Sequence, residues 1–166
     1  MSDSTDVTTA TVRVVVNSEQ INTFFNAMDL TNAERVKAIK SALRKSALIV
    51  RKQTQSNLVA SVPGTNHKSS KKGVSYKALK NEVNLAIYRD ASGARIDLLD
   101  KRRKGSRAYM LKFFEGGTKE RTKGHDRGSI NATNFFSNAV NSKKAEAEKS
   151  LEQNIINMIN KAAKKK

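Results

Sequence analysis

The run TNAERVKAIKSALRKSALIVRKQTQSNLV at residues 31–59 decides the fold of this chain. Its apolar residues recur every three or four positions, which is the spacing of one face of an α-helix. Thr31 can cap the first turn, because Glu34 follows at the spacing of a capping box. Neither glycine nor proline interrupts the run before Pro63. The pattern therefore predicts one long amphipathic helix over residues 32–59.

Short stretches on either side of this helix carry strand patterns. Residues 12–16 form a valine-rich run that is β-branched and too short for a helix. Val83, Leu85 and Ile87 stand at alternate positions, as in a half-buried strand. A turn signal at residues 90–93 then leads into a second strand, which completes a hairpin.

Two further helices are expected toward the C-terminus. Met110, Phe113 and Phe114 share one helical face ahead of a glycine pair, and a strand is the rival assignment for this stretch. A longer helix is predicted from about residue 134 to residue 163. Its alanine-rich apolar stripe allows close approach of a helix from a partner chain, although the two long helices could equally cover the chain's own small sheet. The stripe consists of Phe136, Ala139, Val140, Ala147, Leu151, Ile155, Met158, Ile159 and Ala162.

These patterns predict an α+β fold in which the long amphipathic helix and the C-terminal helix pack on a small antiparallel sheet. Shorter helices are expected after Ser18 and near residues 74–79. We expect residues 1–10 to be a disordered tail, residues 11–163 to form a single domain, and residues 164–166 to be a basic tail. The mobile basic loops are expected at residues 63–73, 101–106 and 116–133.

Composition narrows the class of protein. The 166 residues carry a formal net charge of +17 and no cysteine, so a disulfide framework and a thiolate metal site are excluded. No signal peptide is expected at the polar N-terminus, and no apolar run is long enough to predict a membrane span. Synthesis in a reducing cytoplasm fits this composition.

Motifs of catalysis are scarce. His67 and His125 lie far apart in polar stretches, which does not favour a zinc site. Neither a phosphate-binding glycine loop nor a nucleophile elbow is present. We therefore expect no catalytic residue, no metal and no cofactor, and a small nuclease is a weak alternative.

Four of the six phenylalanines flank a loop rich in glycine and charge. We interpret them as core anchors at the end of one helix and the start of the next, which would hold an assembly loop between them. Glu115 is predicted to be a buried partner of Arg121 or Arg127. The candidate assembly residues are Phe113, Phe114, Glu115, Gly117, Thr118, Arg121, Arg127, Gly128, Phe135, Phe136 and Ala139.

The basic clusters could follow a phosphate backbone or dock on acidic protein surfaces. Tyr109, Phe113 and Phe114 could offer stacking faces, although helical spacing favours the two phenylalanines as core. Non-specific nucleic-acid binding is the alternative function. The candidate contacts are Lys101, Arg102, Arg103, Lys104 and Arg107.

The chain resembles a family of tailed-bacteriophage neck proteins, the minor tail-component or tail-completion proteins near the head–tail joint. The resemblance spans roughly residues 33–163 and rests on the order of elements and on an aromatic-aromatic-Glu-x-Gly-Thr segment. The matching residues are Phe113, Phe114, Glu115, Gly117 and Thr118, followed by Phe135, Phe136 and Ala139. One departure is Asn134, where the family commonly has proline before the phenylalanine.

The resemblance implies a non-enzymatic virion structural protein, made in the host cytoplasm. Such a protein works as a homo-oligomeric ring between portal and tail, with portal or adaptor and tail proteins as partners, and genomic DNA threads the ring. A closed ring needs a head-to-tail interface. We expect the loop at 116–133 and a strand arm carrying Val12, Val14 and Val16 to reach the neighbouring subunit. No membrane partner is expected.

Overall fold

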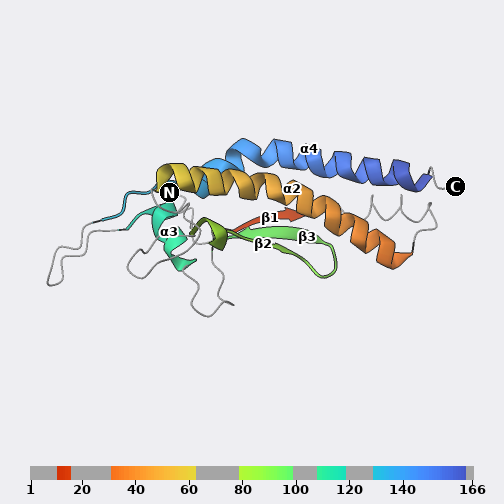
Figure 1. Cartoon of the computed structure of the whole chain (residues 1–166), viewed down its shortest axis with the longest axis horizontal. Helices are drawn as coiled ribbons and strands as arrows, with labels where there is room; N and C mark the ends of the chain where they lie inside the picture. Colours follow the sequence, from red (N-terminus) through yellow and green to blue (C-terminus); the bar gives the residue numbers. More distant parts are fainter. Residues whose placement is uncertain (1–10, 16–30, 63–78, 99–107, 119–128, 164–166) are drawn as a thin grey trace, which may run out of the picture.

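The computed structural model describes residues 11–15, 31–62, 79–98, 108–118 and 129–163, and its elements confirm the α+β class (Figure 1). The predicted short helix after Ser18 lies outside these ranges, as does most of the one near 74–79. In chain order the elements are β1 Thr11–Val15, α2 Asn32–Ser61, the 3-10 helix η1 Leu79–Glu82, β2 Asn84–Ile87, β3 Gly93–Asp97, α3 Tyr109–Gly116 and α4 Phe135–Ala163.

Helix α2 begins with the predicted capping box. The Thr31 hydroxyl accepts a hydrogen bond from the backbone N–H of Glu34 at 3.4 Å, and the Glu34 carboxylate accepts one from the Thr31 N–H at 3.1 Å. These contacts satisfy amide groups that the first turn of a helix leaves without partners. At the other end the N–H of Val62 donates to the Leu58 carbonyl, so the helix ends just before Pro63.

The sheet has three antiparallel strands in the order β1-β3-β2. The β2–β3 hairpin is confirmed, with a Tyr88 N–H to Gly93 carbonyl hydrogen bond of 2.9 Å closing its turn. Within the turn, the backbone N–H and the hydroxyl of Ser92 donate to the Asp90 carboxylate. Those two bonds hold the pKa of Asp90 below its ordinary value.

Strand β1 is confirmed over Thr11–Val15, but its pairing differs from the expected arm. It forms the edge of the chain's own sheet, with Val12 opposite Ile96 and Val14 opposite Ala94. Because β3 already supplies the ladder hydrogen bonds on one edge of β1, the expected contact with a neighbouring subunit would have to use the other edge, and it stays a prediction. Val16 lies outside the described residues.

Helix α2 lies between the sheet and α4, and the two long helices run antiparallel along the length of the molecule (Figure 1). The buried hydroxyl of Ser46 donates to the Ala147 carbonyl at 2.5 Å, near the middle of the pair. Toward the end of α2, Asn57 Nδ2 donates to the Phe135 carbonyl at 3.1 Å. α2 thus packs on the sheet with one face and on α4 with another.

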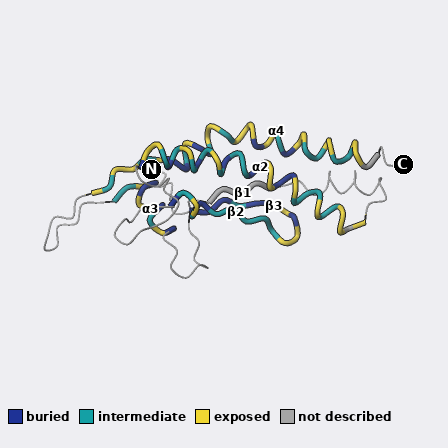
Figure 2. Tube along the Cα trace, viewed as in Figure 1, coloured by how far each residue is buried: buried dark blue, intermediate teal, exposed yellow. Residues whose placement is uncertain are grey.

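The core runs along both faces of α2 (Figure 2). Both long helices bury small residues, with Ala42, Ser46 and Ala47 on α2 and Ala139 and Ala147 on α4, and Ser46 contacts Ala147 directly. Such residues let the helix backbones approach closely. Larger side chains fill the space toward the sheet and the loop end; those with almost no exposed surface are Leu43, Leu58, Leu79, Val83, Ile96, Leu98, Leu111 and Phe135.

Candidate assembly site

The aromatic segment folds as helix α3, which settles the choice between helix and strand. Leu111, Phe114 and Glu115 face inward at helical spacing, and Phe114 is only 6% exposed. Phe113 is 44% exposed, so its predicted role as a core anchor is wrong. The physical reason is that successive residues of a helix point about 100° apart. Because Phe114 lies on the inner face of α3, the side chain of Phe113 points toward the outer face.

The outer face of α3 carries an exposed aromatic pair. Tyr109 and Phe113 are one helical turn apart, with ring centroids 6.1 Å apart in an edge-to-face arrangement. Tyr109 is 55% exposed, and Lys112 on the same helix is exposed as well. We call Tyr109 and Phe113 the aromatic pair. A soluble surface seldom keeps two neighbouring aromatic rings exposed without a partner, so this pair is a candidate contact.

Glu115 caps the next helix. Its Oε2 accepts a hydrogen bond from the Phe136 N–H at 2.7 Å, and its Oε1 accepts bonds from the N–H and the hydroxyl of Ser137 at 2.9 and 2.6 Å. A carboxylate at a helix N-terminus is stabilised by the unpaired amide groups and by the helix dipole. The predicted burial of Glu115 is confirmed.

Among the described residues, the partners of Glu115 are the backbone and one serine of α4. Its expected partners, Arg121 and Arg127, lie outside the described residues. α4 starts one residue after Asn134, which has a φ of +49°. Asparagine tolerates this left-handed conformation, and the ring of proline excludes it. Proline at position 134 would therefore be incompatible with the observed start of α4.

The two ends of the 116–133 loop are joined by a short ladder. The Thr118 N–H donates to the Ile130 carbonyl at 2.9 Å, and the Ile130 N–H donates to the Thr118 hydroxyl at 2.9 Å. The N–H and hydroxyl of Thr133 both donate to the Phe114 carbonyl. We call this ladder, together with the Glu115 cap, the loop clasp. It brings the two ends of the loop together beside α3 and α4.

Gly117 makes the clasp possible. Its φ of +73° and ψ of −179° lie in a region that only glycine occupies readily. A Cβ atom at this position would lie 2.8 Å from the Ile130 carbonyl oxygen and 2.9 Å from the Ala132 nitrogen. The strand-like approach of the two loop ends therefore requires glycine here.

Three of the predicted anchors on the far side of the loop are buried. Phe135, Phe136 and Ala139 of α4 are buried, and the two phenylalanines belong to the same hydrophobic cluster as Phe114, so core residues stand at both ends of the loop. The remaining candidates cannot be placed. Gly128 and the basic candidates Lys101, Arg102, Arg103, Lys104 and Arg107 lie outside the described ranges, as do both histidines.

The described part of the chain holds no group of three histidine, aspartate or glutamate side chains that could bind a metal ion. Glu115, the acid that the sequence singled out, is committed to the α4 cap. In the same ranges, no helix combines the length and the apolar character needed to cross a membrane.

Comparisons with protein-family models, with curated proteins and with solved structures gave no match to this chain.

Proposed function

We propose that this chain is a non-enzymatic structural protein of a tailed-phage virion. It forms a homo-oligomeric ring at the head–tail junction, with portal or adaptor and tail proteins as neighbours, and DNA passes through the ring. The observation that carries the proposal is the loop clasp. Glu115, Gly117 and Thr118, which belong to the motif behind the resemblance, all serve to hold one loop in place.

The position of Glu115 and the loop clasp favours a role in assembly over a role in catalysis. A catalytic acid needs access to a substrate, whereas Glu115 is buried and accepts three hydrogen bonds from α4. The clasp lies next to the aromatic pair, and exposed aromatic side chains are enriched at protein interfaces. In this proposal the aromatic pair contacts the neighbouring subunit.

The test is assembly in the particle. A phage lacking this protein is complemented with the wild-type chain, with a Tyr109→Ser/Phe113→Ser variant, or with an Ile156→Ser control. Ile156 is an apolar residue on α4 that is also 42% exposed. We expect wild type and control to form rings in negative-stain images and to enter virions, and the double variant to fold but stay outside particles. Absence of the wild-type protein from purified virions would refute the proposal.

A second candidate function is non-specific nucleic-acid binding, which the net charge of +17 favours. Purified protein would then bind DNA without any virion partner. The two functions are compatible, since a ring around DNA can also contact it.

A further inference from the structure

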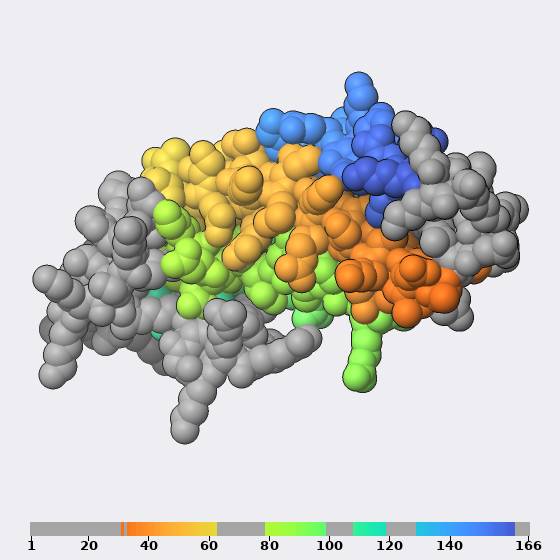
Figure 3. Space-filling view, turned by 45° about the vertical axis from the view of Figure 1, so that its right-hand side comes forward, coloured from red at the N-terminus to blue at the C-terminus, as the bar shows by residue number. Residues whose placement is uncertain are grey.

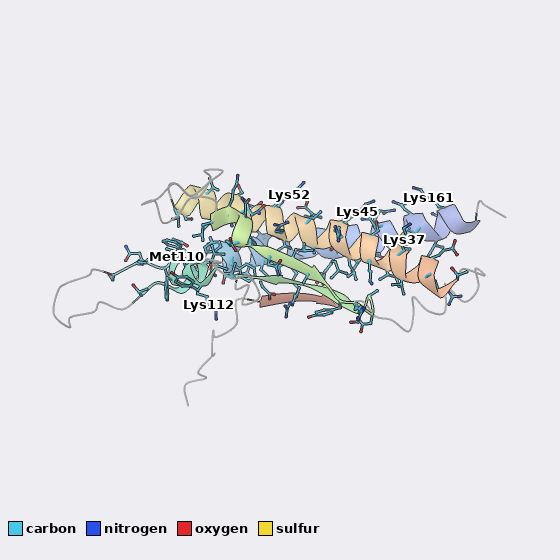
Figure 4. All side chains as sticks on the ribbon, turned by 60° about the horizontal axis from the view of Figure 1, so that its bottom comes forward. Lys37, Lys45, Lys52, Met110, Lys112 and Lys161 are labelled. Atoms are coloured by element: carbon cyan, nitrogen blue, oxygen red, sulfur yellow. The ribbon has the colours of Figure 1, made fainter. Side chains whose placement is uncertain are left out.

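The solvent-exposed face of α2 carries cations without interleaved acids. Lys37, Arg44 and Lys52 are exposed and recur at intervals of seven or eight residues, which brings them close to one side of the helix. Lys45 lies beside this row, and Figure 4 shows the three labelled lysines of α2 following the helix. Glu34, the only acid of α2, sits in the first turn and belongs to the capping box. We call Lys37, Arg44, Lys45 and Lys52 the basic face.

These cations are not neutralised by the part of the chain that the structure describes. Lys37, Arg44 and Lys52 form no ion pair within those ranges, and Lys45 Nζ donates to the Asn154 side chain at 3.3 Å. Elsewhere the chain does pair its charges, as in Arg95–Asp97 at 2.8 Å and Lys143–Glu146 at 2.6 Å. Like charges gathered on one face cost free energy unless an anion binds there.

The surroundings of the basic face suit a phosphate backbone. Large apolar side chains that are exposed occur at Tyr109, Phe113 and Ile156 among the described residues, and none of these is on α2. A protein partner would want an apolar or aromatic centre. A single strand would want aromatic rings for stacking. The α2 face instead offers cations and exposed hydroxyls such as Ser41, which are the usual ligands of phosphate oxygens.

The length and position of the basic face also fit a DNA duplex. At a rise of about 1.5 Å per residue, the row from Lys37 to Lys52 spans about 22 Å, which is more than half of a duplex turn of about 34 Å. Figure 3 shows α2 as a continuous band between α4 and the sheet. A duplex laid along this band could meet several phosphates at once.

We propose that the basic face of α2 binds the sugar-phosphate backbone of duplex DNA without sequence preference. This assignment rests on the proposed function: in the ring, the basic face would line the channel through which the DNA passes. It differs from the contacts expected at residues 101–107, which lie outside the described residues. The chemical partner is the phosphate backbone, so base edges contribute nothing to recognition.

A charge-matched pair of variants tests the assignment. Lys37→Gln/Lys52→Gln removes two cations from the basic face. Lys144→Gln/Lys149→Gln removes two equally exposed cations from α4, where Glu146, Glu148 and Glu152 are interspersed. Binding of the full chain to labelled duplexes of two unrelated sequences is measured by fluorescence anisotropy over a series of salt concentrations, and circular dichroism checks that each variant is folded.

We expect the wild type to bind both duplexes equally, with an affinity that falls steeply with salt. The Lys37→Gln/Lys52→Gln variant, the α2 pair, should reduce the magnitude of the slope of log affinity against log salt by about 2, since each lost phosphate contact removes about one unit. Its affinity at about 0.1 M salt should fall at least tenfold. The Lys144→Gln/Lys149→Gln variant should change the affinity by less than about twofold, because Glu148 and Glu152 follow these lysines four and three residues later on the same helix.

Equal losses for the two pairs would overturn the assignment to α2, and so would a wild type that does not bind DNA at low salt. If the α2 pair lost binding to a portal or tail protein while DNA binding stayed intact, the basic face would be a protein-docking surface and the inference would be wrong. None of these results bears on virion entry of the wild-type chain, which decides the proposed function separately.

Discussion

Glu115 joins two helices through one carboxylate. Replacing it with alanine leaves the N–H groups of Phe136 and Ser137 without their acceptor in a partly buried site. We expect Glu115→Ala to lower the free energy of unfolding by about 1–3 kcal/mol. Urea denaturation measures the change. Glu148→Ala is the control. Glu148 is exposed on α4, the helix that Glu115 caps, and its replacement should change the free energy of unfolding by less than about 0.5 kcal/mol. Equal effects of the two substitutions would contradict the capping role.

The two neighbouring glycines give a matched comparison of backbone strain. Gly117→Ala places a Cβ against the Ile130 carbonyl and the Ala132 nitrogen at a φ of +73°. We expect it to destabilise the protein by about 1–3 kcal/mol. Gly116→Ala meets no atom within 4 Å and lies at the end of α3, so it should be neutral or slightly stabilising. Thermal unfolding of both variants tests this, and a neutral Gly117→Ala would mean that the clasp is not held as described.

The sequence indicates the importance of some of these residues but not the contacts that they make. Glu115 and Gly117 stood out because an acid between a phenylalanine and two glycines is an unusual composition for a surface loop. The partners of Glu115 were missed, since they lie on α4, 21 and 22 residues further along the chain. Phe113 and Phe114 were equally apolar, and only the packing of the three-dimensional core decides which of two adjacent rings is buried.

At the scale of elements, the α2–α4 contact depends on small side chains. Ser46 is fully buried between the helices and its hydroxyl donates to Ala147. Ser46→Leu should force the helices apart and lower the stability by about 1–3 kcal/mol, whereas Ser46→Ala should cost only about 1 kcal/mol for the lost hydrogen bond. Ser41→Leu, on the exposed face, should be nearly neutral. Chemical denaturation of the three variants ranks their stabilities. A Ser46→Leu variant as stable as the wild type would show that α2 and α4 tolerate a wider separation.

Elements governed by local signals were predictable. Periodicity and a capping box place α2 within two residues of its observed end, and the turn residues place the β2–β3 hairpin. The pairing of β1 with β3 was not foreseen, because about 80 residues separate the two strands and β-pairing carries no local signature of its partner. The order of layers, with α2 between α4 and the sheet, likewise depends on long-range packing.

At the scale of the whole molecule, the charge of +17 sets how stability responds to salt. Self-repulsion destabilises a compact state, and salt screens it over a Debye length of about 10 Å at 0.1 M. We therefore expect the melting temperature to rise by a few degrees between about 20 and 200 mM sodium chloride, since about 1 kcal/mol corresponds to about 2–4 °C for a chain of this size. Differential scanning calorimetry measures the shift.

The distribution of the charge makes a sharper prediction than its sum. Lys37→Glu/Lys52→Glu and Lys144→Glu/Lys149→Glu lower the net charge equally. The first pair places acids among the cations of the basic face on α2, while the second adds acids to a helix that already holds Glu146, Glu148 and Glu152. The α2 pair should therefore raise the melting temperature at low salt and flatten its salt dependence, and the α4 pair should do less. If both pairs behaved alike, total charge alone would govern the stability, and the basic face of α2 would carry no special repulsion for a polyanion to relieve.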